Sequence, residues 1–203
     1  DCWETRAKSA AATLETEAFT DYRKVLDIKE IDYVTIATPE HWHADMTIAA
    51  MDAGKAVYCE KPMTHSIPEA QAVWKKAKET GRPLQVGVQA MSDNSYTTAA
   101  EAIKKGVIGK VIQAQIEYVR RYDKQGPWRD PDLKDDMPKP ADLNWKDWLG
   151  HAPTIDWNPH HYFEWRNYAR YSGGIATDLF IHRITRIMKA CDLLYPRRVV
   201  GMG

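Results

Sequence analysis

Two clusters of ionisable residues in this chain have types and spacings that suit proton transfer, as in the oxidation of an alcohol. In the first, Lys61 stands between Glu60 and Pro62; in the second, Asp178 precedes His182 by four residues. Such a reaction needs a base for the hydroxyl proton and a group that steadies the developing alkoxide. Lys61 and His182 are the natural pair for these tasks. Asp178 can orient the imidazole, because residues four apart on a helix share a face.

Both clusters also have an ordinary structural interpretation. Glu60 and Lys61 can form a surface ion pair, and Asp178 and His182 can form a pair on a helix surface. The position of Lys61 favours chemistry, because it follows an apolar strand at the edge where open α/β sheets bind their ligands. Pro62 also holds the Lys61 backbone extended, so this lysine is better placed than a mobile surface lysine.

The residues around Lys61 alternate between strand and helix patterns, which predicts a parallel sheet with right-handed crossovers. Asp32–Pro39 is a β-branched run closed by proline, which is typical of a buried strand. Ser66 and Glu69 form a capping box, and Gly54 is a predicted helix C-cap. The predicted order is strand 32–39, helix 40–54, strand 56–59, helix 66–81 and strand 84–88.

The second half of the chain changes character. Val111–Arg121 alternates between polar and apolar residues, which predicts a strand of an open sheet with one apolar face. The stretch 126–142 is rich in proline and charge and predicts a loop, and 156–172 is aromatic with little periodicity. Helices are predicted over 96–105, 145–149 and 174–192, and the last would carry both Asp178 and His182.

The segment from Asp32 to Gln89 resembles the glucose–fructose oxidoreductase / inositol dehydrogenase / MocA family of NAD(P)-dependent enzymes. Its matching residues are specific in this order and spacing, although each alone is weak. A second block, Gly173 to His182, resembles the family's glycine-rich opening to a helix that carries Asp and His. The other matching residues are Ile36-Ala37-Thr38-Pro39, His43, Ala53-Gly54-Lys55, Glu60-Lys61-Pro62, Trp145 to Gly150 and Trp165-Arg166.

The resemblance implies a fold class and a domain division. It implies an α/β chain whose residues 1–90 form a partial NAD(P)-binding Rossmann domain. Residues 91–203 would begin an α+β domain with an open, mainly antiparallel sheet, which is a partial C-terminal domain for substrate binding and oligomerisation.

The resemblance also implies an activity. A nicotinamide cofactor, NAD with NADP as an alternative, would exchange hydride with a sugar, cyclitol or related polyol. By resemblance, His182 accepts the proton, Lys61 polarises the reacting oxygen, and Asp178 supports one or both. Cofactor contacts are expected from Asp1, Thr38, Pro39, His43, Glu60, Lys61 and Gln89, and substrate contacts from His160, His161 and Arg166.

Several assignments have open alternatives. His43 can instead cap a helix end, and loop residues such as His160 are often structural. His41 and His43 suggest a metal, but no cysteine or carboxylate cluster completes a site by spacing, so no metal is expected. The same residues could serve NAD-dependent glycoside cleavage. A non-catalytic nucleotide-binding domain is a further alternative, which the joint presence of Lys61, Asp178 and His182 disfavours.

The glycine-rich turn that opens dinucleotide-binding domains is missing, because the sequence contains no G-x-G-x-x-G. Asp1 would align with the acidic residue that binds the adenosine ribose. We therefore expect an internal fragment of a longer, homo-oligomeric enzyme, inactive by itself and a poor binder of NAD. The acidic residue predicts a preference for NAD over NADP, and nearby Arg6 weakens that prediction because it could meet a phosphate.

Composition excludes several classes of protein. The formal net charge of the 203 residues is zero, which gives no electrostatic case for binding nucleic acid or an anionic membrane. The three cysteines are odd in number and widely separated, which argues against a disulfide framework. No apolar run reaches the length of a membrane span. A cytoplasmic location is favoured, with the reservation that an export signal would precede the printed residues.

Overall fold

A three-stranded parallel sheet forms the centre of the region around Lys61 in the computed structural model, which describes residues 1–89, 91–119, 121–122 and 126–201. The strands are β1 (Tyr33–Ile36), β2 (Ala56–Glu60) and β3 (Leu84–Gly87), in the spatial order β1-β2-β3. Ile36 pairs with Cys59, and Cys59 pairs with Val86, so the three strands end together. The predicted sheet is thereby confirmed.

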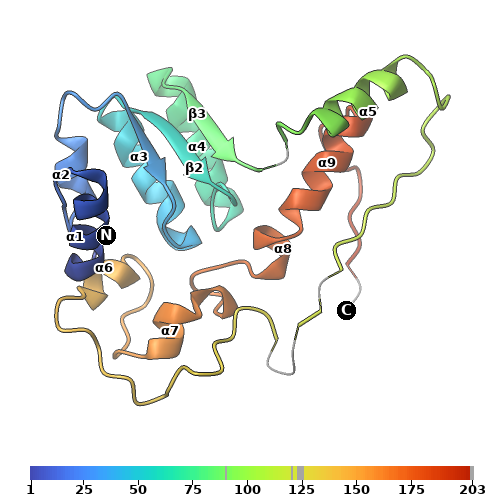
Figure 1. The fold of residues 1–203 in the computed structure, drawn as a ribbon. Helices are drawn as coiled ribbons and strands as arrows, with labels where there is room; N and C mark the ends of the chain where they lie inside the picture. Colours follow the sequence, from blue (N-terminus) through green and yellow to red (C-terminus); the bar gives the residue numbers. More distant parts are fainter. Residues whose placement is uncertain (90, 120, 123–125, 202–203) are drawn as a thin grey trace. The chain divides into compact units, whose positions relative to one another are not determined.

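Two helices connect the strands and pack against one face of the sheet (Figure 1). A short 3₁₀ helix, η1 (Glu40–Trp42), leads into α3 (His43–Asp52), and α4 (Ile67–Thr80) follows β2. The alternate residues Val57 and Cys59 of β2 are buried against these helices, while Tyr58 between them is exposed. The core of this layer consists of Ile36, Ala44, Ala50, Met51, Val57, Cys59 and Val73.

The ends of α4 follow its sequence signals. The Ser66 hydroxyl accepts from the Glu69 amide, and the Glu69 carboxylate accepts from the Ser66 amide, which is the predicted capping box. Gly81 closes the helix with a φ of +63°, a left-handed conformation that favours glycine. Local hydrogen bonds therefore fix where the helix begins and ends.

Two helices, α1 (Glu4–Leu14) and α2 (Tyr22–Leu26), precede the sheet. Aromatic side chains build a second core from α6 (Trp145–Leu149), α7 (Pro159–Phe163), η2 (Trp165–Asn167) and the loops around them, with Cys2 and Trp3 packed against it. Trp145 and Trp148 stack with their ring centroids 4.8 Å apart. Asp142 joins the two ends of this region, because its carboxylate accepts from the Thr5 amide at 2.7 Å and from the Trp3 indole at 3.0 Å. The predicted helix over 145–149 is confirmed, with Asn144 as its cap.

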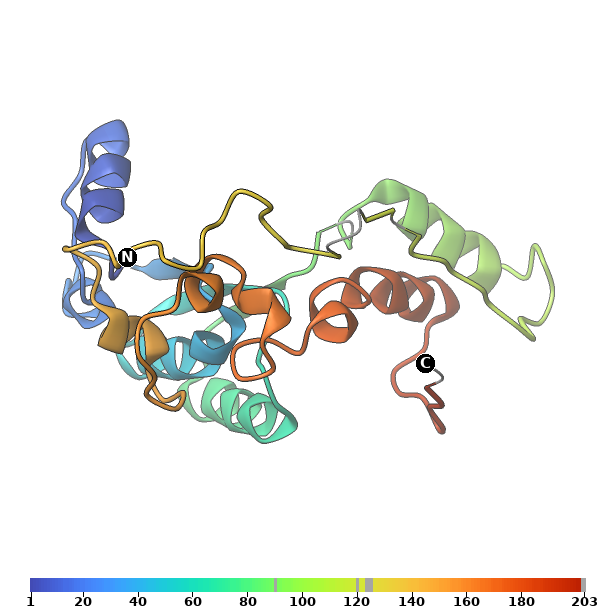
Figure 2. The ribbon, with the colours of Figure 1, turned by 90° about the horizontal axis from the view of Figure 1, so that it is seen from below.

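The chain packs as two compact units, and the sheet and the aromatic core belong to the first. That unit comprises Asp1–Gly87 and Tyr122–Gly174, and the second comprises Val88–Arg121 and the residues from Ile175 onward. The second unit contains α5 (Asn94–Lys104), α8 (Ile175–Asp178) and α9 (Ile181–Cys191). In both ribbon views α5 and α9 lie side by side (Figures 1 and 2). The division near residue 90 stays a prediction about domains.

The strand predicted over Val111–Arg121 is wrong for the residues that the structure describes there. Residues 111–119 and 121 form no strand, and residue 120 lies outside the described residues. On the predicted apolar face Ile112 is 92% exposed, whereas Ile116 and Tyr118 are half-buried, and the Arg183 guanidinium lies 4.6 Å from the Tyr118 ring centroid. An alternating pattern specifies a strand only when a partner strand pairs with it. The predicted antiparallel sheet is therefore not supported.

The single helix predicted over 174–192 is also wrong, because the structure divides it into α8 and α9 at Leu179 and Phe180. The Phe180 amide donates five residues back to the Ile175 carbonyl, and the His182 amide donates only three residues back to Leu179. The regular four-residue hydrogen-bond ladder is interrupted at this point. Asp178 therefore ends one helix, and His182 is the second residue of the next.

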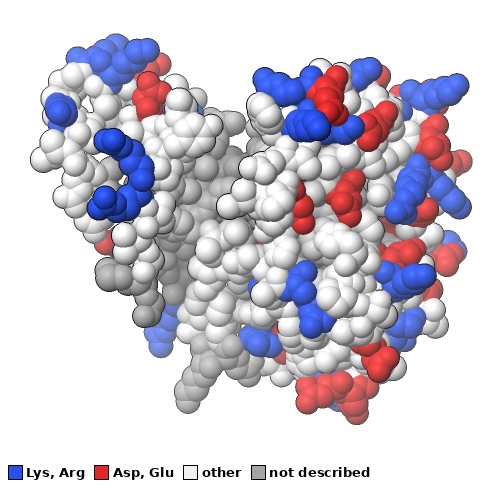
Figure 3. Space-filling model, turned by 180° about the vertical axis from the view of Figure 1, so that it is seen from behind, with Lys and Arg blue, Asp and Glu red and all other residues white. Residues whose placement is uncertain are grey.

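Charged side chains of both signs are interspersed over the molecular face shown in Figure 3. This matches the balance of 28 Lys and Arg residues against 28 Asp and Glu residues. Among the residues that the structure describes, no helix is both long enough and apolar enough to cross a membrane.

Candidate active site

Lys61 directly follows the last residue of β2, and the Lys61–Pro62 peptide bond is cis. The Lys61 amide lies 3.3 Å from the Glu60 carboxylate. Thr38 and Pro39 follow the carboxyl end of the neighbouring strand β1. Because parallel strands end at a common edge, both turns lie where α/β sheets bind ligands.

His43 ties these two turns together from the first residue of α3. Its Nδ1 lies 2.6 Å from the Pro62 carbonyl oxygen, and its Nε2 lies 2.9 Å from the Thr38 carbonyl oxygen. The side chain is 1% exposed. Both partners are carbonyls, and the start of α3 has no side-chain cap bond, so the His43 side chain does not cap that helix, although His43 ends η1. His43 instead holds the turn that carries Lys61 beside the turn that carries Thr38.

An open cavity of about 1170 Å³ lies in the first unit, along the edge strand β1 and the turn that follows it. Among the predicted site residues, Asp1, Thr38, Pro39 and Arg166 line it. The Thr38 hydroxyl is enclosed and has no hydrogen-bond partner among the described residues. The cavity lining therefore combines an acidic residue, Asp1, with a basic residue, Arg166.

The side chains that line this cavity fit a dinucleotide. A carboxylate such as Asp1 suits ribose hydroxyls, and cations such as Arg6 and Arg166 suit phosphates. Trp42 and Trp165 add aromatic surface to the same lining, which suits a nucleobase or a sugar. Of the predicted cofactor residues, Asp1, Thr38 and Pro39 line this cavity, whereas His43, Glu60 and Lys61 are not part of its lining.

The two charged residues near the chain start are already partly engaged. One Asp1 carboxylate oxygen accepts from the Trp3 amide at 3.0 Å. Arg6 donates to the Tyr162 hydroxyl at 3.2 Å, and its guanidinium lies 5.6 Å from the Trp3 ring centroid. Arg6 is therefore directed at aromatic partners, which reduces its availability for a phosphate.

Asp178 and His182 belong to the second unit, on α8 and α9. Asp178 is 4% exposed, and His182 is half-buried. Gln89 belongs to the second unit as well and is exposed. The joint action of Lys61, Asp178 and His182 remains a prediction.

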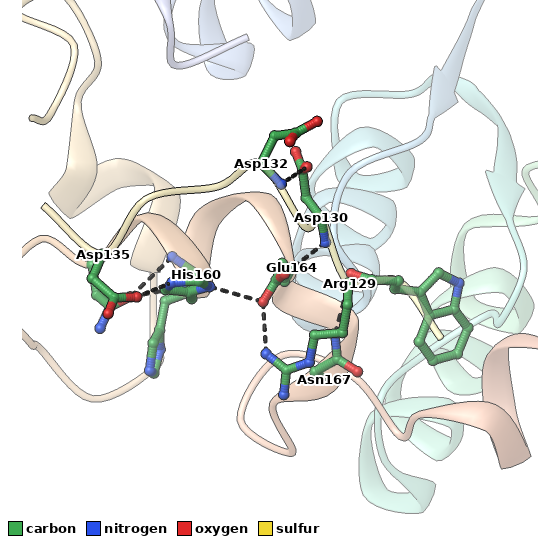
Figure 4. A network of polar contacts seen from close by, with 10 residues as sticks. Arg129, Asp130, Asp132, Asp135, His160, Glu164 and Asn167 are labelled. Atoms are coloured by element: carbon green, nitrogen blue, oxygen red, sulfur yellow. Dashed lines mark hydrogen bonds and ion pairs between the residues drawn. The ribbon is translucent and has the colours of Figure 1, made fainter. Parts of the chain in front are cut away.

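His160 has both ring nitrogens committed to carboxylates, as Figure 4 shows. Its Nδ1 lies 3.0 Å from Glu164, and its Nε2 lies 2.7 Å from Asp135. The hydrogen bonds to Glu164 and then Asp135 raise the pKa of His160. Because these partners occupy the ring, the contacts of His160 are those of a structural residue.

Glu164 is the buried centre of this network (Figure 4), with an exposure of 2%. Its carboxylate accepts from the Arg129 guanidinium at 2.7 Å and from the Asp130 amide at 2.8 Å, besides His160. Burial alone would raise the pKa of Glu164, but the bonds from Asp130, His160 and Arg129 together hold it below its usual value. The network fastens the loop around residue 130 to α7.

His161 and Arg166 have different surroundings. The His161 ring stacks on Tyr168 at 3.8 Å, and its Nδ1 lies 3.0 Å from the Tyr171 hydroxyl. Burial lowers the pKa of His161. Arg166 lies over the Trp165 ring at 4.2 Å and lines the cavity. Of the three predicted substrate residues, the structure therefore brings only Arg166 to the cavity.

Two buried residues at the sheet edge, Glu40 and His41, were not among the predicted site residues. His41 is fully buried, and burial lowers its pKa to about 4, so its imidazole is neutral over the ordinary pH range. Glu40 is 1% exposed and contacts residues more than 130 positions away. Their position directly after Thr38 and Pro39 was the available signal. Within the described ranges, no group of three or more His, Cys, Asp or Glu side chains could hold a metal.

Two family models match the chain in succession. The model described as an oxidoreductase family with an NAD-binding Rossmann fold matches residues 2–88, and that of an oxidoreductase-family C-terminal alpha/beta domain matches residues 93–192. The chain therefore belongs to the glucose–fructose oxidoreductase / inositol dehydrogenase / MocA family of oxidoreductases, as its motifs predicted.

The sequence similarity to curated relatives covers about half of this chain. A scyllo-inositol 2-dehydrogenase (NAD(+)) of Bacillus subtilis is 42% identical over 108 residues, which is 53% of this chain and 32% of the relative. A levoglucosan dehydrogenase of Pseudarthrobacter phenanthrenivorans is 32% identical over 113 residues, or 54% of this chain and 29% of that protein. The chain thus spans about a third of the length of these relatives.

Among solved structures, a levoglucosan dehydrogenase in complex with NADH and levoglucosan covers 94% of this chain with a TM-score of 0.64. The identity is 23%, and the matched part is 43% of that protein. This likeness shows a shared fold across both predicted domains.

Proposed function

We propose that this chain is part of an NAD(P)-dependent oxidoreductase that transfers hydride between a sugar, a cyclitol or a related polyol and the nicotinamide cofactor. The carrying observation is Lys61 at the end of β2, tied through His43 to the Thr38 turn beside the cavity. Membership of an oxidoreductase family and the names of the inositol and levoglucosan dehydrogenases support the reaction class.

In this proposal the bound nicotinamide accepts hydride, and the chain's own residues handle the proton and the developing charge. His182 accepts the hydroxyl proton, and Lys61 polarises the reacting oxygen. Asp178 supports the imidazole or the lysine. Arg166, beside Trp165 at the cavity, is the remaining candidate for contacts to substrate hydroxyls.

NAD is the proposed cofactor, with NADP as the alternative. A carboxylate such as Asp1 accepts hydrogen bonds from the ribose hydroxyls and repels a 2′-phosphate. The engagement of Arg6 with Tyr162 supports the same preference. Calorimetry of the full-length protein with each cofactor is expected to give tighter binding of NAD, and tighter binding of NADP would contradict the assignment of Asp1.

The reaction is tested by incubating full-length protein with NAD and a panel of inositols, anhydrosugars and aldoses. The expected result is the appearance of NADH, followed by its near-ultraviolet absorbance, with at least one member of the panel. Cofactor binding without NADH formation from any polyol would favour the non-catalytic alternative.

A further inference from the structure

Glu40 is a buried carboxylate whose contacts lie far away in the sequence. It follows the Thr38-Pro39 turn directly and belongs to η1. One carboxylate oxygen accepts from the Ser172 hydroxyl at 2.6 Å, and the other accepts from the Gly173 amide at 3.0 Å. Both carboxylate oxygens therefore bind the same turn, residues 172–174, at which the first unit ends.

Further hydrogen bonds complete the attachment of this turn. The Gly174 amide donates to the Ser172 hydroxyl at 2.9 Å, so this hydroxyl accepts from Gly174 and donates to Glu40. The His41 amide donates to the Tyr171 carbonyl at 3.3 Å. Gly174 has a φ of +67°, which requires glycine at the point where the chain enters α8.

The chemistry of the contact suits a carboxylate and no other side chain equally well. The Gly173 amide and the Ser172 hydroxyl both present hydrogens, so both partners need an acceptor. A glutamine has one acceptor oxygen and one donor NH₂ group, and it would leave one of these hydrogens without its acceptor. Hydrogen bonds to an ionised group are also stronger than neutral ones.

We propose that Glu40 is a positioning residue that fixes the turn Ser172-Gly173-Gly174, the point from which α8 with Asp178 and then α9 with His182 begin. The link to catalysis rests on the proposed function. Glu40 directly follows Thr38 and Pro39, which are predicted cofactor residues. Its carboxylate holds the turn from which the chain continues to His182, the proposed base.

The first test measures amide hydrogen exchange of full-length protein in Glu40→Gln and Ser172→Ala variants. Exchange in the peptide from Tyr171 to Ile175 is expected to accelerate about tenfold or more in both, while β1 to β3 keep their protection. The control is Glu79→Gln, which replaces an exposed glutamate of α4. It is expected to leave the exchange rate of this peptide unchanged. Unchanged exchange in a folded Glu40→Gln or Ser172→Ala protein would overturn the proposal.

The second test measures turnover of a polyol that the wild type oxidises. In Glu40→Gln, kcat is expected to fall about tenfold to 100-fold, because misplacement by about 1 Å costs that much, while KM for NAD changes little. Adding Ser172→Ala should reduce kcat little further, since both changes break one contact. A loosened turn with wild-type kcat would overturn the link to catalysis. If the wild type oxidises no polyol, the proposed function has failed, and hydrogen exchange alone decides the role of Glu40.

Discussion

The edge of the parallel sheet and the aromatic segment after residue 126 hold their ionisable groups in different ways. At the sheet edge, His43 binds the carbonyls of Thr38 and Pro62, so backbone atoms fix the positions. In the aromatic segment, His160, Glu164 and Arg129 hold one another through their side chains. In the first arrangement one side chain contacts backbone carbonyls, whereas in the second the polar side chains bind one another.

This difference separates the surroundings of Lys61 from those of His160. Lys61 stands on a turn that His43 contacts at the neighbouring Pro62 carbonyl. The imidazole of His160 has both nitrogens engaged by carboxylates. A histidine inside a satisfied network stabilises a loop and has no nitrogen left for a substrate hydroxyl.

The largest effect is expected at the sheet edge, from Lys61→Ala. Turnover of the full-length enzyme should fall at least 100-fold, about 2.7 kcal/mol of barrier, because the group that polarises the reacting oxygen is lost. Steady-state kcat is the measurement, and Lys75→Ala on the exposed side of α4 is the matched control. Near-normal turnover of Lys61→Ala would show that the reaction does not need Lys61.

In the aromatic segment, Glu164→Gln should lower stability much more than a surface change. The buried acceptor of three donors would be replaced by a group that is half donor, which is expected to cost about 1–3 kcal/mol of unfolding free energy. Urea denaturation measures this, and Glu79→Gln should stay within about 0.5 kcal/mol of the wild type. Equal stability of the two variants would show that the network in Figure 4 contributes little.

His43→Ala, a change at the sheet edge, should lower kcat more than a change to a histidine of the aromatic segment. The contacts of the two ring nitrogens with the Thr38 and Pro62 carbonyls are lost, and the turn that carries Lys61 is freed from the Thr38 turn. We expect kcat to fall about tenfold, about 1.4 kcal/mol. His161→Ala, which removes a partner of Tyr171 and Tyr168 in the aromatic segment, is the comparison. A larger loss of kcat in His161→Ala would reverse the roles assigned to the two regions.

The smallest effect concerns pH. The pKa of His160 is raised in the folded protein by Glu164 and Asp135, so folding favours its protonated form. Its contribution to stability is full below the unfolded pKa of about 6.5 and is lost as pH rises through the higher folded pKa. The stability difference between wild type and His160→Gln should therefore shrink as the pH rises above about 6.5. A difference that grows with pH would contradict this assignment.

The sequence predicted the sheet edge well because its signals are local. A β-branched run, a capping box and Glu60-Lys61-Pro62 each act over a few residues, and the pairing of β1 to β3 follows from their order. The contacts of Glu40 with Ser172 span 132 residues, and those of Glu164 with Arg129 span 35, so no local pattern reveals them.

The same reasoning explains the two incorrect elements. The alternation in Val111–Arg121 is a local signal whose outcome depends on a distant partner strand. The helix break at Leu179 and Phe180 has no glycine or proline to mark it, and only the interrupted hydrogen-bond ladder shows it. The spacing of Asp178 and His182 therefore carried less geometric information than a continuous helix would give.

The most direct test of the central claim is the stoichiometry of NADH formed against polyol consumed by the full-length enzyme. An oxidoreductase must form one NADH for each polyol oxidised to a carbonyl product, because the hydride leaves the substrate for good. We predict that one-to-one ratio, with a ketone or lactone as the product. Substrate cleavage without net NADH would contradict the account and identify the glycoside-cleaving alternative, in which the cofactor is regenerated in each cycle.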